Sequence, residues 1–195
     1  MKKIIFGHGN IPIIFLHGTH TPYDSFWIKQ IYELIDPNKY QVICPEFPSL
    51  YKENNEHNDK TDELTLLLRD FILSEQFGQN LIIIGKSLGA KIAVGLTKSI
   101  DIGQLILLGY PFTYSTNEIR NDRLKKINVL TVATQIIQGS NDQYGSKGNC
   151  SNLKLMENIQ LEWIEDTDHN FFSKNEKIIN EENLNRIRKS LDKIL

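Results

Sequence analysis

Short aliphatic runs recur along the chain and stop abruptly, most of them at a glycine or a proline. Most of the runs are apolar almost throughout, and all are too short for a full helix, which favours strands buried on both faces of a parallel sheet. The six runs cover residues 11–16, 40–44, 81–84, 105–108, 134–138 and 159–164. We therefore expect these segments to form one sheet.

Between the runs lie segments whose apolar residues recur every three or four positions, as in amphipathic helices. Thr61 and Asn180 are the predicted N-caps of the first and last of them. The three apolar stripes are Leu64, Leu67, Leu68, Phe71 and Ile72; Leu88, Ile92 and Leu96; and Leu184, Ile187, Leu191 and Ile194. Alternating strands and helices predict the α/β class, as one domain over residues 1–195 with a doubly wound, mostly parallel sheet and helices on both faces.

A serine stands at one junction between a run and a helical stripe. Gly85-Lys86-Ser87-Leu88-Gly89 follows the run 81–84 directly and opens the second helix. A serine on such a tight turn has its hydroxyl above the sheet edge, and the flanking glycines avoid clashes with the neighbouring strand and helix. The pattern predicts a nucleophile elbow with Ser87 as nucleophile, and an ordinary glycine-rich turn is the alternative.

A serine hydroxyl is a poor nucleophile at neutral pH, so Ser87 needs a base, and the base needs a carboxylate that orients it. The one histidine downstream of Ser87 is His169, in a loop between the last run and the last helix. Where a serine occupies this kind of turn, its partners follow in the order serine, acid, histidine. Asp142, after the run 134–138, fits the acid, and Asp166 and Asp168 are competitors very close to His169 in sequence.

Acyl transfer also needs N–H donors aimed at the carbonyl oxygen that becomes negative in the transition state. One predicted donor is the backbone N–H of Leu88, the residue after the nucleophile. The other is Thr19, in the loop that follows the run 11–16. In the same loop we expect His17 to bond locally and take no part as a base, and His20 is a candidate substrate contact.

The chain resembles the α/β-hydrolase superfamily over nearly its whole length, and within it small dienelactone-hydrolase-like and carboxylesterase-like members. The shared segments are the elbow, Gly109-Tyr110-Pro111, Gln138-Gly139-x-x-Asp142-x-x-Gly145 and Asp168-His169-x-Phe171. The resemblance implies a triad of Ser87, Asp142 and His169. It also implies an oxyanion hole at Thr19 and Leu88.

The chain departs from these relatives in ways that bear on the substrate. Lys86 stands where a histidine or glutamate usually precedes the nucleophile, and a serine stands where dienelactone hydrolases typically have cysteine. Too few residues separate the runs 105–108 and 134–138 for a cap domain, which predicts an open, shallow site. Lys86 and Tyr110 are candidate substrate contacts, and the polar segment 52–60 is a candidate mobile rim.

Composition restricts the partners. The chain has 40% hydrophobic and 24% charged residues and a formal net charge of -2, which is ordinary for a globular protein and argues against nucleic acid or an anionic membrane as partner. No run is long enough to span a membrane and no export signal is recognisable, so we expect a cytoplasmic protein. The histidines lack metal-ligand spacing and no phosphate-binding loop occurs, so we expect no metal and no cofactor.

Two functions from different classes are consistent with the sequence. The first is a serine hydrolase that cleaves a small carboxylic ester or thioester, or transfers its acyl group, through an acyl-enzyme. The second is a catalytically inactive binding protein with the same fold, because a fold alone does not fix a function. The reactivity of Ser87 distinguishes them. The oligomeric state does not follow from the sequence.

Overall fold

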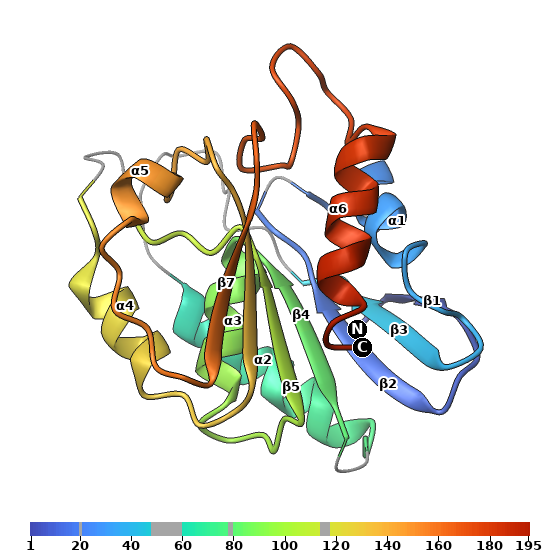
Figure 1. The fold of residues 1–195 in the computed structure, drawn as a ribbon. Helices are drawn as coiled ribbons and strands as arrows, with labels where there is room; N and C mark the ends of the chain where they lie inside the picture. Colours follow the sequence, from blue (N-terminus) through green and yellow to red (C-terminus); the bar gives the residue numbers. More distant parts are fainter. Residues whose placement is uncertain (20, 48–59, 78–79, 114–117) are drawn as a thin grey trace, which may run out of the picture.

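The computed structural model describes residues 1–19, 21–47, 60–77, 80–113 and 118–195, and seven strands of this part form one sheet (Figure 1). The strand order across the sheet is β1-β3-β2-β4-β5-β6-β7. Strand β1 is antiparallel to β3, and every other pair of neighbours is parallel. The strands are β1 (Lys3–Phe6), β2 (Ile11–Leu16), β3 (Tyr40–Pro45), β4 (Ile82–Lys86), β5 (Gln104–Leu108), β6 (Thr134–Gly139) and β7 (Ile159–Ile164). The predicted mostly parallel sheet is confirmed.

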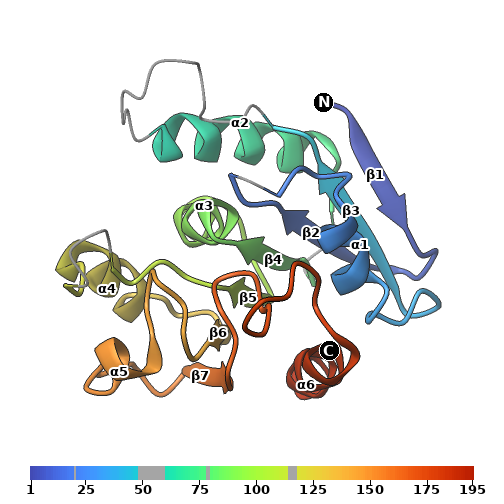
Figure 2. The same ribbon diagram turned by 90° about the horizontal axis from the view of Figure 1, so that it is seen from above.

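Helices cover both faces of the sheet, as predicted. Seen from above, α2, α3 and α4 lie on one face, and α1 and α6 lie on the other (Figure 2). The helices of the described residues are α1 (Phe26–Tyr32), α2 (Thr61–Ser74), α3 (Leu88–Leu96), α4 (Asn121–Asn128), α5 (Lys147–Cys150) and α6 (Glu181–Leu191).

Successive side chains of the central strands enter different cores. In β2, Ile14 and Leu16 belong to the core beneath α2 and α3, whereas Ile13 and Phe15 belong to the core beneath α1 and α6. Side chains of a strand point alternately to the two faces of a sheet, so a strand covered on both sides must be apolar throughout. This double burial explains why the runs 11–16, 81–84 and 105–108 show no polar alternation.

Helix α2 differs in two details from its prediction. The N-cap position is occupied by Lys60, and Thr61 is the first helical residue. Leu67 is 42% exposed, whereas Leu68 is fully buried. Successive helical residues are about 100° apart around the axis. The buried residues Leu64, Leu68, Phe71 and Ile72 define the side of α2 that faces the sheet, and Leu67 lies outside this side. The prediction that Leu67 belongs to the buried stripe is therefore wrong.

The last helix fits its prediction at its start and differs at its end. The side chain of Asn180 accepts a hydrogen bond from the backbone N–H of Asn183 at 2.9 Å, which confirms the predicted N-cap. Helix α6 ends at Leu191, so Ile194 lies beyond it, although Ile194 still packs against the core.

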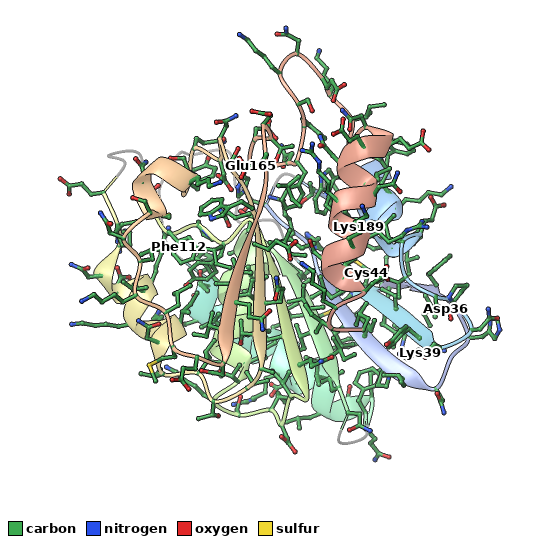
Figure 3. All side chains as sticks on the ribbon, viewed as in Figure 1. Asp36, Lys39, Cys44, Phe112, Glu165 and Lys189 are labelled. Carbon is green, nitrogen blue, oxygen red and sulfur yellow. The ribbon has the colours of Figure 1, made fainter. Side chains whose placement is uncertain are left out.

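The carboxyl ends of the parallel strands meet at one edge of the sheet, the upper edge in Figure 1. Glu165, which follows β7 directly, marks this edge in Figure 3. Only residues 109–120 separate β5 from α4, so no cap domain is inserted there, as predicted. Within the described ranges, no helix combines the length and the apolar character needed to cross a membrane.

Candidate active site

Ser87 is the single residue between the end of β4 and the start of α3. Its backbone has φ 52° and ψ −106°, a conformation that residues with a side chain rarely adopt. The turn is tight because Gly85 and Gly89 allow close approach: a Cβ at Gly89 would lie 2.1 Å from the carbonyl oxygen of Leu16. A Cβ at Gly85 would lie 2.5 Å from the carbonyl oxygen of Gly89. The local geometry is that of the predicted elbow, and Ser87 is half-buried.

Asp142 and His169 form a buried pair. Oδ2 of Asp142 lies 2.7 Å from Nδ1 of His169, and the carboxylate has no exposed surface. The backbone N–H of Tyr144 donates to Oδ1 at 2.7 Å, and Nε2 of Gln138 donates to Oδ2 at 2.7 Å. Since a carboxylate can only accept here, the imidazole carries its proton on Nδ1, and Nε2 is left as the acceptor.

The serine turn and the histidine loop meet at the end of β5. The backbone N–H of Ser87 donates to the carbonyl oxygen of Leu108 at 3.0 Å. The next residue, Gly109, has φ 60°, and a Cβ there would lie 3.2 Å from both Cε1 and Nδ1 of His169. The imidazole therefore lies directly against the backbone of Gly109, next to Leu108, whose carbonyl oxygen accepts the hydrogen bond from Ser87. Three segments that are distant in sequence, the serine turn, the end of β5 and the histidine loop, thus converge at this point.

Asp166 and Asp168, the two alternative candidates for the acid, do not hydrogen-bond to His169 in the structure. Oδ1 of Asp168 accepts hydrogen bonds from the backbone N–H groups of Asn170 at 2.8 Å and Phe172 at 3.0 Å, so it shapes its own loop. Asp166 is exposed, at a turn position with φ 60°. The carboxylate hydrogen-bonded to His169 is that of Asp142.

Burial controls the ionisation of the histidine. His169 is only 7% exposed, and this desolvation lowers the pKa of its imidazole, with the ammonium group of Lys86 as the second cause. The hydrogen bond and the charge of Asp142 act in the opposite direction, together with the charge of Asp168. Because the net pKa is below the ordinary 6.5, the imidazole is neutral at pH 7 and able to accept a proton.

The two predicted oxyanion donors lie on segments that touch. Leu88 is the first residue of α3, where backbone N–H groups have no partner within the helix. Thr19 follows β2, and the close contact of Gly89 with Leu16 holds the start of α3 against the end of β2. Nδ1 of His17 lies 2.9 Å from the carbonyl oxygen of Gly18, so His17 bonds within its loop.

Of the three residues predicted to contact the substrate, two are buried and the third lies outside the described residues. Lys86 and Tyr110 are each 1% exposed, so neither side chain is available to contact a substrate in this structure. The Tyr110 hydroxyl donates to the carbonyl oxygen of Arg123 at 3.4 Å and packs against Phe112. His20 lies outside the described residues, as do residues 52–59 of the predicted rim.

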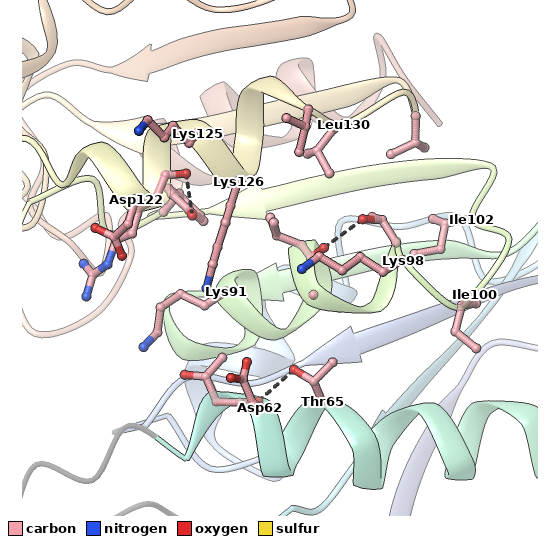
Figure 4. Close-up of a pocket in the computed structure, with 18 of the residues that line it drawn as sticks. Asp62, Thr65, Lys91, Lys98, Ile100, Ile102, Asp122, Lys125, Lys126 and Leu130 are labelled. Carbon is pink, nitrogen blue, oxygen red and sulfur yellow. Dashed lines mark hydrogen bonds between the residues drawn. The ribbon is translucent and has the colours of Figure 1, made fainter.

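A groove of about 710 Å³ lies between α2, α3 and α4, and its walls include Asp62, Lys98, Lys126 and Leu130 (Figure 4). None of Ser87, Asp142 and His169 lines it. Acidic and basic side chains share its rim, and some are paired with each other, as Arg120 is with Asp122. The three candidate residues therefore lie apart from this groove.

Gln138 and Trp27 were not recognised as site residues from the sequence. Gln138 belongs to a segment that the resemblance already included, but its role as a donor to Asp142 becomes visible only in the structure. Trp27 donates from Nε1 to the carbonyl oxygen of Asn170 at 2.9 Å, and so ties α1 to the histidine loop. Neither contact has a sequence signal, because each joins elements whose relative position depends on the packing of the whole fold.

A serine in a strained strand-to-helix turn, beside a buried histidine and carboxylate at the carboxyl ends of a parallel sheet, defines an α/β hydrolase. Residues 9–195 match the family model described as "Alpha/beta hydrolase domain", and the chain belongs to this family. No curated protein sequence matches the chain.

Solved structures share the fold at low sequence identity. A lipase-esterase related protein from Clostridium acetobutylicum is 10% identical with a TM-score of 0.72, over 100% of this chain and 99% of that one. A monoacylglycerol lipase from Paleococcus ferrophilus is 12% identical with a TM-score of 0.71, over 97% of each chain. A meta-cleavage product hydrolase from Pseudomonas fluorescens is 14% identical with a TM-score of 0.68, over 99% of this chain and 94% of that one.

Proposed function

We propose that the protein is a serine hydrolase that cleaves a small carboxylic ester or thioester through an acyl-enzyme. The observation that carries this proposal is the buried contact between Asp142 and His169, at 2.7 Å. The imidazole of this pair lies against Gly109, the residue after the one whose carbonyl oxygen accepts a hydrogen bond from Ser87. Several proteins with this fold bear the names of lipases and esterases, which is consistent with the proposal.

In the first half of the reaction, Oγ of Ser87 attacks the substrate carbonyl carbon while Nε2 of His169 takes the hydroxyl proton. The oxyanion accepts hydrogen bonds from the backbone N–H groups of Leu88 and Thr19. Collapse of the tetrahedral intermediate expels the alcohol or thiol, which takes the proton from His169. Asp142 keeps the imidazole in the Nδ1–H tautomer and stabilises its cationic form.

In the second half, water attacks the acyl-enzyme and gives a proton to Nε2 of His169. The acid product leaves, and the proton returns to Oγ of Ser87, which restores the enzyme. An alcohol or thiol in place of water would give acyl transfer by the same steps. Because no cap domain is inserted between β5 and α4, we propose that the acyl group is short or exposed.

The proposal is tested with a fluorophosphonate probe, which reacts with activated serines, followed by intact mass and peptide mapping. We expect one adduct, on Ser87, that is absent in Ser87→Ala and strongly reduced in His169→Ala. Ser99→Ala, an exposed serine just after α3, is the matched control and should label like the wild type. Turnover of short esters should fall by about 10⁶-fold in Ser87→Ala.

The same experiment decides between the two function classes. If the folded protein forms no adduct and hydrolyses neither short esters nor short thioesters, the hydroxyl is not activated and the binding-protein alternative is favoured. If the adduct forms, the ratio of thioester to oxygen-ester turnover identifies the leaving group.

A further inference from the structure

Lys86 places a cation inside the protein next to the proposed nucleophile. It is the last residue of β4, directly before Ser87, and it is 1% exposed. Its Nζ donates to the backbone carbonyl oxygen of His169 at 2.7 Å and lies 5.6 Å from the centre of the Trp27 ring. A Cβ at Gly109 would lie 3.1 Å from Nζ. The ammonium group is therefore held between the nucleophile turn and the histidine loop.

Trp27 makes a similar contact with the next residue of the histidine loop. It belongs to α1, and Nε1 donates to the carbonyl oxygen of Asn170 at 2.9 Å, while its ring stacks on Phe171 at 6.2 Å. Two consecutive carbonyl groups, those of His169 and Asn170, are thus held by donors from two different elements. Both donors are buried side chains, which lose little further conformational freedom when they bond.

These contacts determine where the imidazole lies relative to Ser87. The bonds to Oδ1 of Asp168 give the loop its internal shape but do not set its distance from the nucleophile. The bond from Lys86 does, because Lys86 is covalently linked to Ser87. A change of about 1 Å in such an arrangement can cost about 100-fold in rate.

We propose that Lys86 and Trp27 are positioning residues, which hold the main chain of the histidine loop so that Nε2 of His169 faces Ser87. The expected effect on the rate rests on the proposed function. The contacts with the histidine loop and the effect of Lys86 on the pKa of His169 do not. Lys86 acts through His169 and does not touch the substrate.

The ammonium group also acts on the charge of the imidazole. The ionisable groups that face this pair are the carboxylates of Asp142 and Asp168, and the ring of Tyr144, which packs edge-on against His169 at 4.7 Å. Burial lowers the pKa of Lys86 to about 7, although both carboxylates act to raise it. In the range below pH 6.5, where His169 titrates, Lys86 is therefore mostly charged, and its repulsion favours the neutral imidazole.

Two variants test the proposal: Trp27→Phe removes a positioning bond without a change in charge, whereas Lys86→Met removes a positioning bond and a charge together. Lys86→Met keeps a buried side chain of similar length but removes the cation and the hydrogen bond. Trp27→Phe keeps an aromatic ring but removes the donor to Asn170. Lys98→Met, which removes an exposed lysine just after α3, is the control for the change in net charge. The measurements are the pKa of His169, from NMR titration of its ring Hε1 signal, and the pH profile of kcat/KM for a short ester.

In Lys86→Met we expect the pKa of His169 to rise by about one unit and the acid limb of kcat/KM to move upward with it. In Trp27→Phe we expect kcat to fall about tenfold while the acid limb stays in place. Lys98→Met should change neither quantity. An unchanged His169 pKa together with unchanged kcat in Lys86→Met would overturn the role of Lys86, and unchanged kcat in Trp27→Phe would overturn that of Trp27.

A measurement on the wild type covers the case in which Lys86→Met does not fold. The Hε1 signal of His169 should then show a second, smaller shift that coincides with the titration of the Lys86 side chain, followed by ¹³Cε NMR. Absence of this second shift would contradict the coupling. If the wild type neither reacts with a fluorophosphonate nor hydrolyses esters, the proposed function fails, while the NMR result still decides whether Lys86 acts on the charge of His169.

Discussion

Gln138 lies four residues before Asp142 and donates from its amide Nε2 to the carboxylate Oδ2 at 2.7 Å. The same nitrogen lies 3.2 Å from the carbonyl oxygen of Tyr110 and 3.3 Å from that of Gly145. Three acceptors around one atom require that atom to be the nitrogen, and the opposite amide oxygen has no hydrogen-bond partner among the described residues. Gln138 therefore fixes the carboxylate on the side opposite Tyr144.

Gln138→Leu tests the importance of this contact. The substitution keeps the approximate volume but removes the amide donor that three buried acceptors share. Oδ2 of Asp142 keeps its contact with His169, and the carbonyl oxygen of Tyr110 keeps the bond from the backbone N–H of Phe112. We expect a loss of about 1–3 kcal/mol in the free energy of unfolding. The freed carboxylate should also lower kcat by about tenfold. Urea denaturation and ester kinetics measure the two effects, and wild-type kcat in a destabilised variant would show that Tyr144 alone orients Asp142.

Asp142→Asn is expected to lower kcat by about 10⁴-fold with little change in fold. An amide that donates to His169 would favour the tautomer with the proton on Nε2, which cannot accept the proton of Ser87. Asp166→Asn is the matched control, because Asp166 is exposed and asparagine tolerates its φ of 60°. Equal activity in the two variants would argue against Asp142 as the acid of the triad.

The pH dependence follows from the ionisation of His169. In the proposed mechanism the neutral imidazole is the active form. Its pKa lies below the ordinary 6.5, so kcat/KM should be high at pH 7 and fall as the pH falls through that lowered pKa. The acid limb of a profile from about pH 5 to 8 should thus have its midpoint below 6.5. A midpoint clearly above this value would mean that the carboxylate of Asp142 outweighs burial and Lys86.

Gly89→Ala should destabilise the protein, although alanine usually favours a helix over glycine. A Cβ at this position would lie 2.1 Å from the carbonyl oxygen of Leu16, and neither backbone can move without separating α3 from β2. We expect a loss of about 2 kcal/mol or more in the free energy of unfolding. At Gly103 the nearest atom would lie 3.5 Å away, so Gly103→Ala should change stability by about 0.5 kcal/mol or less.

The sheet could be predicted from the sequence because its central strands are buried on both faces and are aliphatic throughout. Strand β1 could not, since it is a four-residue edge strand in which Ile5 is exposed. Helices α1, α4 and α5 were missed for a related reason. They are short, with four to eight residues, so each contains about two turns at most, too few to establish a helical period.

The candidate site was more predictable than its surroundings. Each of Ser87, Asp142 and His169 follows a strand end, and parallel strands bring such positions together. Asp142 could be preferred over Asp166 and Asp168 from its place after a strand end, and the structure shows the contact of its carboxylate with His169. The burial of Lys86 could not be predicted, because a lysine at the end of a strand is ordinarily solvated.

The backbone of Ser87 has a further consequence for how such a protein can change over time. A side chain at φ 52° costs on the order of 1 kcal/mol, a cost that glycine does not bear. Ser87→Gly should therefore unfold at a higher temperature than the wild type while it loses ester turnover. Replacement of Ser87 by glycine would thus increase stability and abolish turnover. A serine that persists at this position is therefore retained for its reactivity and not for its contribution to stability.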